Sequence, residues 1–159
     1  MTKGVTKGVT KGVTKAERST LELGDTFESD MQMRWGEADS LNHMNNVVYF
    51  RYMEEGRIQS FAAAGIESTD RCGPVVVHVS CDFFKQINYP STVRVTHRVV
   101  RIGRSSLEHE VDLAVVDGDT TDLRARGRSI MVWMDFELAK SAPWPPEVLS
   151  AMARTANRR

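Results

Sequence analysis

The chain has 159 residues, of which 41% are hydrophobic and 26% charged, as expected for one soluble globular domain with a substantial core. Its 21 basic and 21 acidic residues give a formal net charge of zero, which argues against a surface built for nucleic acid. No apolar run approaches the roughly 20 residues that span a bilayer, and the N-terminus lacks the apolar stretch of a secretory signal. We therefore expect a cytoplasmic protein with no nucleic-acid or membrane partner.

The first segment is a short repeat, because the unit Thr-Lys-Gly-Val occurs three times between Thr2 and Val13. Residues 1–20 carry five basic side chains against one acidic side chain, so the rest of the chain is net negative. A four-residue unit rich in glycine and lysine buries little apolar surface, and we predict a disordered basic arm over residues 1–24. The functional alternative is an electrostatic tether to RNA, a membrane or an acidic partner.

The next elements expected are a strand over 27–35, a polar loop and a helix over 46–64. Asparagine at 45 and 46 suits the helix start, because its side-chain oxygen can accept a backbone N–H of the first turn. One stripe of this helix is hydrophilic and consists of Arg51, Glu54, Glu55 and Gln59. The opposite stripe contains Gly56, which predicts close packing of the helix on a sheet.

Four strands are expected next, over 75–87, 93–102, 106–116 and 123–136, and a tight turn joins the last two. Along 106–116, apolar residues and His109 alternate with acidic residues, and arginines alternate on both neighbouring strands. This pattern predicts one buried face and one solvated face with cross-strand ion pairs. The last strand is apolar on both faces. Because one helix covers only one face, we expect a partner subunit.

The loop before the helix concentrates the polar chemistry of the chain. It runs through Arg34-Trp35-Gly36-Glu37-Ala38-Asp39 and then His43-Met44-Asn45-Asn46. A helix N-terminus carries partial positive charge and free N–H donors, which suit a developing anion. Asp39 is therefore a candidate base or nucleophile beside an oxyanion site.

This loop and the following Val47-Val48-Tyr49-Phe50-Arg51-Tyr52 resemble the signature of the 4-hydroxybenzoyl-CoA thioesterase-like acyl-CoA thioesterases, over about residues 27–146. The resemblance implies an α+β hot-dog fold, in which an antiparallel β-sheet wraps around one long central helix. It implies hydrolysis of an acyl-CoA or acyl carrier protein thioester, with no metal and no cofactor beyond the coenzyme A of the substrate. It also implies a homodimer or homotetramer with shared sites. The hot-dog domain would cover 25–146, and 147–159 would be a tail with a short helix after Pro146.

The resemblance assigns roles to three residues of the loop. It implies that Asp39 is the acidic catalyst and that the backbone N–H of Asn46 stabilises the oxyanion. His43 either takes part directly or orients the substrate. Plant-type acyl carrier thioesterases of the same fold carry Asp-x-Asn-x-His, but the middle position is Leu41 here, so that triad is incomplete.

Other candidate residues lie outside this loop. Arg104 and Ser105 belong to a turn that resembles the family's coenzyme A-binding turn, and a guanidinium with a hydroxyl suits phosphate. The alternative is an ordinary glycine hairpin with solvated ends. Another branch of thioesterases uses a helix glutamate, whereas Glu54 and Glu55 fall on the hydrophilic stripe and are interpreted as solvated.

Several chemistries have no support in the sequence. It contains no metal-type cluster, phosphate-cradling glycine loop or serine elbow, and Cys72 and Cys81 are expected to be free thiols. Two alternatives to a thioesterase remain. One is a sensor that binds acyl-CoA without cleaving it, although a sensor needs no attacking carboxylate. The other is a hot-dog hydratase or dehydratase. Those enzymes resemble one another in an Asp-x4-His spacing, whereas only three residues separate Asp39 from His43 here.

Overall fold

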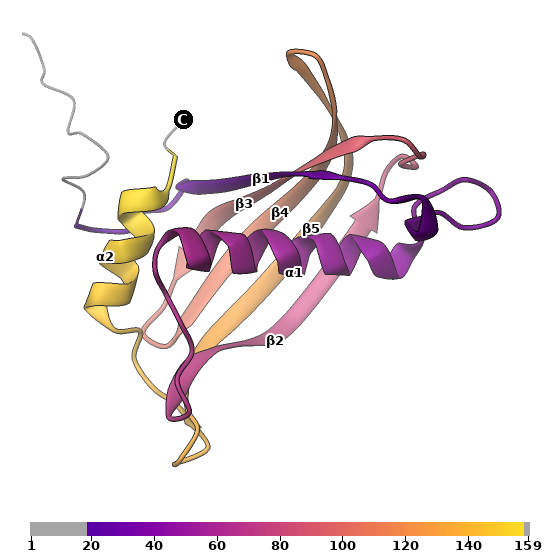
Figure 1. The fold of residues 1–159 in the computed structure, drawn as a ribbon. Coiled ribbons are helices and arrows are strands. Elements are labelled where there is room, and N and C mark those ends of the chain that lie inside the picture. Colours follow the sequence, from indigo (N-terminus) through magenta and orange to yellow (C-terminus); the bar gives the residue numbers. More distant parts are fainter. Residues whose placement is uncertain (1–18, 158–159) are drawn as a thin grey trace, which may run out of the picture.

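The computed structural model describes residues 19–157, which form one antiparallel sheet packed against a long helix (Figure 1). The strands are β1 (Thr26–Gln32), β2 (Cys72–Phe83), β3 (Thr92–Ile102), β4 (Ser106–Asp117), β5 (Thr120–Asp135) and β6 (Lys140–Ser141). The helices are the 3-10 turn η2 (Trp35–Glu37), α1 (Asn46–Ala63) and α2 (Pro146–Thr155). No helix among the described residues is both long and apolar enough to cross a membrane.

The sheet has the order β1-β3-β4-β5-β2, with the short β6 paired to the end of β5. Consecutive strands β3, β4 and β5 pair as hairpins, whereas β1 and β2 lie at the two edges. Helix α1 connects these two edge strands and lies across one face of the sheet (Figure 1). The predicted α+β hot-dog fold is therefore confirmed.

Helix α1 approaches the sheet closely at its middle. A Cβ atom added to Gly56 would lie 3.1 Å from Cγ1 of Val95 and 3.2 Å from Nε2 of His97. Both distances are shorter than ordinary van der Waals contact, so a side chain here would push the helix away from β3. The glycine that costs helix propensity is thus required by packing, as its place on the apolar stripe predicted.

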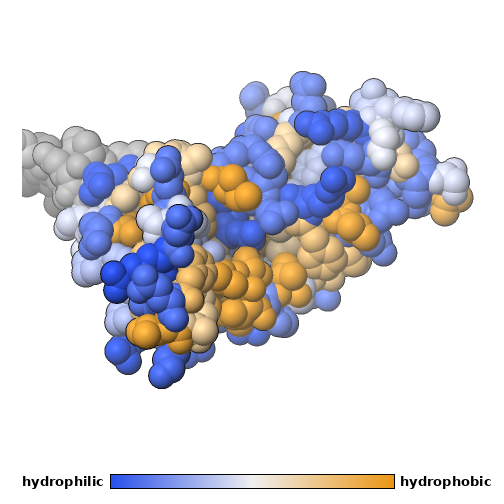
Figure 2. All heavy atoms as spheres, turned by 60° about the horizontal axis from the view of Figure 1, so that its bottom comes forward, coloured by the Kyte–Doolittle hydropathy of each residue, from blue (hydrophilic) through white to orange (hydrophobic). Residues whose placement is uncertain are grey.

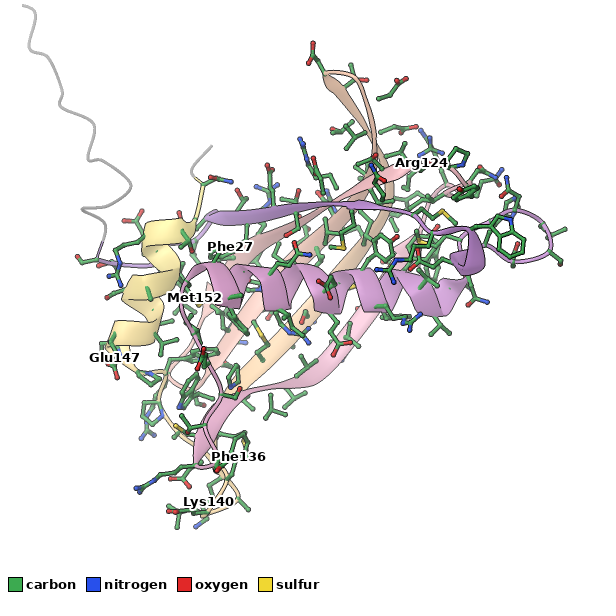
Figure 3. The ribbon with its side chains drawn as sticks, in the orientation of Figure 1. Phe27, Arg124, Phe136, Lys140, Glu147 and Met152 are labelled. Atoms are coloured by element: carbon green, nitrogen blue, oxygen red, sulfur yellow. The ribbon has the colours of Figure 1, made fainter. Side chains whose placement is uncertain are left out.

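The core divides into two clusters along α1. The first lies around the helix N-terminus and includes Met44, Tyr49 and Ile87. The second lies at the other end, where α2 covers the sheet and Trp133 packs against Trp144 at a ring-centroid distance of 5.1 Å. Figure 3 shows Phe27 of β1 and Met152 of α2 at this second end, and Arg124 at the first.

Two histidines occupy the sheet between the clusters. His97 and His109 are each 1% exposed, and their rings meet edge to face at 5.5 Å. Nε2 of His97 lies 3.0 Å from the backbone oxygen of Met53. Among the described residues, both ring nitrogens of His109 and the hydroxyl of Ser129 have no hydrogen-bond partner. The prediction of a buried face on β4 is therefore correct. This face includes a small group of polar side chains that lack hydrogen-bond partners among the described residues.

The opposite face of β4 carries the predicted ion pairs. Arg126 binds Asp112 through two nitrogens at 2.6 and 2.9 Å, and Arg128 binds Glu108. At the sheet edge, Arg94 of β3 binds Asp30 of β1 in the same two-pronged way. These pairs are partly exposed to solvent, so each contributes only about 1 kcal/mol to stability.

Several boundaries differ from those expected, including the starts of β2 at Cys72 and of β5 at Thr120. Strand β1 ends at Gln32 rather than Trp35, because the Glu37 carboxylate accepts the N–H of Arg34 and turns the chain into η2. Strand β2 ends at Phe83, and residues 84–87 form a loop. Leu21 is 5% exposed and packs in the second cluster, so the globular unit begins before residue 25. The remainder of the predicted arm, residues 1–18, lies outside the described residues.

Candidate active site

The polar loop folds into a tight hairpin before α1. Asp39 donates its N–H to the oxygen of His43 at 2.8 Å, and Asn42 donates its N–H to the oxygen of Asp39 at 3.0 Å. Ala38 and Met44 form a β-bridge at the base. The turn requires a left-handed residue, and Asn42 supplies it with a φ of 58°, a conformation that asparagine tolerates better than most residues.

The hairpin holds the Asp39 carboxylate by one oxygen. Oδ1 accepts the N–H of Leu41 at 2.8 Å and the N–H of His43 at 3.0 Å. These two backbone hydrogen bonds lower the pKa of Asp39 below its usual value, so the group is ionised at neutral pH. Oδ2 accepts no hydrogen bond from any residue between 19 and 157, and the side chain is exposed in the single chain.

The start of α1 leaves one backbone donor open. Asn45 is the N-cap, as predicted: its Oδ1 accepts the N–H of Val47 at 3.0 Å, and its oxygen accepts that of Val48 at 2.8 Å. The N–H of Asn45 itself binds the oxygen of Glu37. Within the described part of the chain, the N–H of Asn46 is left without an acceptor. This N–H is the group that, by the family resemblance, stabilises the oxyanion.

These groups meet in one cavity of about 230 Å³. Its lining includes all three residues singled out in the loop, namely Asp39, His43 and Asn46. The remaining lining consists of Met44, Tyr49, Phe83, Phe84, Lys85 and Gln86. Residues that carry a carboxylate, an imidazole and the first N–H of a helix therefore line the same small space, as acyl transfer needs.

The wall of the cavity opposite the loop was missed by sequence reasoning. Phe83 meets the ring of Tyr49 edge to face at 4.8 Å. The N–H groups of Phe84 and Lys85 both bind the backbone oxygen of Arg124, whose Nη1 donates to the oxygen of Gln86 at 2.8 Å. The alternation of β2 breaks at two consecutive phenylalanines, which was the available signal in the sequence.

The predicted coenzyme A-binding residues lie elsewhere. The oxygens of Arg104 and Ser105 accept the N–H groups of Trp144 and Trp133, so this turn sits at the α2 end of the sheet. It follows the 11-residue strand β3, which begins beside the Asp39 loop. At about 3.3 Å per residue the two places are roughly 35 Å apart. One chain does not bring them together, and their role stays a prediction.

The other candidates fit the solvated interpretation. Glu54 lies 3.7 Å from Arg57, and Glu55 accepts a hydrogen bond from Gln59 on the exposed side of α1. Cys72 and Cys81 are free thiols, and burial raises the pKa of Cys81 to about 11. Among residues 19–157, no three histidine, cysteine or acidic side chains gather as metal ligands would.

Comparison with known proteins places this chain in a family. The model of the thioesterase-like superfamily matches residues 33–152, which include the hairpin, α1 and the whole sheet except β1. The chain belongs to the thioesterase-like superfamily. The family resemblance and the enzyme class inferred from the sequence, a thioester hydrolase, are thereby confirmed.

Individual proteins are similar to this chain over most of its length. The chain is 33% identical to the PA2801 protein of Pseudomonas aeruginosa, with a TM-score of 0.72 over 82% of this chain and 99% of that one. It is 28% identical over 131 residues to the YsmA protein of Bacillus subtilis, covering 82% of this chain and 87% of YsmA. Slr0204 of Synechocystis, a 1,4-dihydroxy-2-naphthoyl-CoA thioesterase, shares the fold with a TM-score of 0.70 at 17% identity, over 80% of this chain and 95% of Slr0204.

Proposed function

We propose that this thioesterase hydrolyses an acyl-CoA, or an acyl carrier protein thioester, to a free acid and a thiol in the cytoplasm. The observation that carries the proposal is the pairing of two open groups in one cavity. Oδ2 of Asp39 and the backbone N–H of Asn46 both lack a partner among residues 19–157, and both residues line the same 230 Å³ space.

The reaction uses these groups in complementary roles. The thioester carbonyl oxygen lies against the N–H of Asn46, where the partial positive charge of the helix end stabilises the developing oxyanion. The ionised Asp39 either takes a proton from an attacking water or attacks the acyl carbon itself. The carbon–sulfur bond breaks, and the thiolate of coenzyme A leaves and is protonated by solvent. When Asp39 itself attacks, a second step follows in which water hydrolyses the acyl–Asp39 anhydride, which releases the free acid and restores the carboxylate. His43 borders the cavity, and its own N–H holds the carboxylate, so we assign it an orienting role.

Oxygen-18 and trapping with hydroxylamine separate the two roles of Asp39. In H2(18)O, label found in Asp39 after many turnovers shows a nucleophilic Asp39 whose acyl anhydride is hydrolysed at the Asp39 carboxyl carbon. Label found only in the product fits a general base or an anhydride hydrolysed at the acyl carbon, and hydroxylamine traps acyl groups as hydroxamates only from the anhydride. Mass spectrometry of the acid and of the peptide that contains Asp39 gives the answer. The proposed steps need only water and protein groups, so we expect activity to survive dialysis against a chelator.

Release of free thiol from a panel of acyl-CoA and acyl carrier protein thioesters tests the function itself. The panel spans short, long and aromatic acyl groups, because the chain length is not determined by the site. We expect turnover on at least one member, with a low KM. Tight binding of one thioester without turnover on any of them would contradict the proposal and support a sensor instead.

We further propose that the enzyme is a homo-oligomer, a homodimer or homotetramer, in which β2 meets another copy. This edge strand exposes Val75, Val77 and Val79 by 37%, 58% and 43%. Figure 2 shows apolar side chains in a band on the side of the molecule that lies at the bottom of Figure 1, where β2 forms the sheet edge. The strand continues into Phe83, which lines the cavity, so a partner on β2 would lie beside the site.

A matched pair of variants tests this interface. Val77→Lys puts a charge on the exposed edge, which should dissociate the oligomer in light scattering at micromolar concentration. Val100→Lys changes a valine of β3 that is 40% exposed away from the β2 edge and should leave the assembly intact. A fully active monomer in the wild type would contradict the shared site.

A further inference from the structure

Two asparagine side chains join the Asp39 hairpin to the loop that follows β2. Nδ2 of Asn88 donates to the backbone oxygen of Asn42 at 2.9 Å. In return, Nδ2 of Asn42 donates to the backbone oxygen of Tyr89 at 3.3 Å. Each amide thus binds the backbone of the opposite loop. The two loops are 46 residues apart in the chain, so this contact depends wholly on the tertiary structure.

The side of the contact that carries Asn88 is firmly anchored. The oxygen of Asn88 accepts the hydroxyl of Ser91 at 2.6 Å. The oxygen of Ser91 accepts the N–H of Met33, which directly follows β1. The neighbouring Ile87 is completely buried in the first core cluster. The loop after β2 is therefore a fixed platform, and the exposed hairpin is the part that is held against it.

We propose that Asn42 and Asn88 are positioning residues that clamp the hairpin and so keep the carboxylate of Asp39 aligned with the N–H of Asn46. This inference rests on the proposed function of that site. The carboxylate is held by hydrogen bonds from its own hairpin, to Leu41 and His43. Its position relative to α1 therefore depends on where the hairpin lies.

The clamp acts on the turn of the hairpin, where it has the most effect. The base is already fixed, since Met44 donates to the oxygen of Ile87 at 2.7 Å and Asn45 donates to that of Glu37. Asn42 is the last residue of the turn that begins at Asp39, and the two amide contacts are made at this residue. A displacement of about 1 Å at a catalytic group can cost about a hundredfold in rate. Exposed hydrogen bonds contribute little to folding, so the clamp governs rate more than stability.

The test uses two single variants and their combination. Asn88→Ala removes the donor to Asn42. Asn42→Gly removes the donor to Tyr89 but preserves the left-handed backbone, which glycine adopts freely. In the double variant we expect kcat for thiol release to fall at least about tenfold, with KM within about threefold of the wild-type value. The melting temperature should change by no more than about 2 °C.

A control variant separates positioning from general destabilisation. Arg94→Met breaks the ion pair with Asp30 on the outer sheet surface and should lower the melting temperature slightly without changing kcat. If the clamp variants lose rate only in proportion to their fall in melting temperature, or if Arg94→Met loses as much kcat for the same fall, the clamp is structural and the proposal is wrong. An unchanged kcat in the double variant also overturns it.

A second readout does not require turnover. The N–H groups of Leu41 and His43 bind Asp39, so their hydrogen exchange reports how tightly the hairpin is held. We expect exchange at these two amides to become at least about tenfold faster in both clamp variants and unchanged in Arg94→Met. Wild-type exchange in the variants would overturn the clamp. A wild-type enzyme inactive on every thioester would instead refute the proposed function, with the exchange result still deciding whether the clamp exists.

Discussion

Helix α1 has two polar regions, and they are built in opposite ways. At its N-terminus, the Asp39 hairpin is exposed, and two backbone N–H groups hold the Asp39 carboxylate. At its middle, His97 and His109 are fully buried, and three of their four ring nitrogens have no partner among the described residues. The first region leaves a carboxylate oxygen of Asp39 and the N–H of Asn46 open at the surface of the molecule. The second leaves open groups that no substrate can reach.

This difference separates polar groups that are able to take part in a reaction from polar groups that are only packed inside the protein. A carboxylate surrounded by water and N–H donors stays charged, as the lowered pKa of Asp39 reflects. A buried imidazole loses its hydration without replacement, and the nearby guanidinium of Arg57 adds repulsion, so the pKa of His97 falls to about 4. The pKa of His109 is lowered in the same direction by burial and by its neighbours His97 and Arg57. The first region is therefore expected to control rate and the second stability.

The largest effect is expected from Asp39→Asn. The amide oxygen can still accept the N–H groups of Leu41 and His43, so the hairpin should keep its shape. It can neither attack nor accept a proton, and kcat should fall at least about a hundredfold while KM changes much less. Steady-state thiol release measures both. Near-normal turnover in a folded variant would remove Asp39 from the mechanism.

Next comes the oxyanion donor at the helix start. Asn46→Pro deletes the N–H, and proline is well tolerated at the first helical position. The preceding Asn45 already has the extended backbone that proline requires, with φ −61° and ψ 138°. We expect kcat to fall about a hundredfold, the lower end of the cost of one oxyanion donor. Asn46→Ala retains the N–H and serves as the matched control. Equal activity of the two variants would contradict the assignment.

The second region should reveal itself through pH. The unfolded chain binds protons on His97 near pH 6.5, whereas the folded chain does so only near pH 4. Stability is thus complete above about pH 6.5 and is lost as the pH falls towards 4. From this residue alone, the free energy of unfolding should be about 2 kcal/mol lower at pH 5 than at pH 7.5. Urea unfolding at the two pH values measures the difference.

Variants identify the source of that pH dependence. His109→Met removes one of the two buried rings and should reduce the loss between pH 7.5 and pH 5. His78→Gln changes an exposed histidine of β2 and should leave the loss unchanged. The paired carboxylates Asp30 and Glu108 have lowered pKa values, so their contributions are lost only at lower pH. An identical pH dependence in His109→Met and wild type would show that His109 contributes nothing to it.

The smallest effect is expected from removal of residues 1–18. Both regions of α1 and both core clusters lie within the described residues, and the Thr-Lys-Gly-Val repeat has no apolar periodicity. We expect the melting temperature, the oligomeric state and kcat to be unchanged within error. Leu21 must be kept, because it is buried against the second cluster. Dissociation of the oligomer after this deletion would show that the repeat takes part in assembly.

Much of this molecule is determined by short-range patterns in the sequence. The N-cap at Asn45 and the alternation of β4 depend on neighbours within a few residues, and both were predicted correctly. The place of Gly56 on the apolar stripe of the helix also indicated its close approach to the sheet, although the atoms that it meets belong to β3. The grouping of Asp39, His43 and Asn46 also follows from local order, because one hairpin and one helix start position all three. Such features need no knowledge of how distant strands pair.

Only the tertiary structure determines which residues lie opposite Asp39, His43 and Asn46. The register of β2 against β5 brings Arg124 beneath the Phe84–Gln86 wall, and the path of the following loop brings Asn88 to Asn42. The turn of Arg104 joins β3 and β4 at the far end of the sheet, where its backbone oxygens meet Trp133 and Trp144. Packing of the sheet against α1 encloses His109, which has no hydrogen-bond partner among the described residues. Strand pairing joins residues tens of positions apart through backbone hydrogen bonds that any side chain allows, so no local pattern of residue types records which of them will meet.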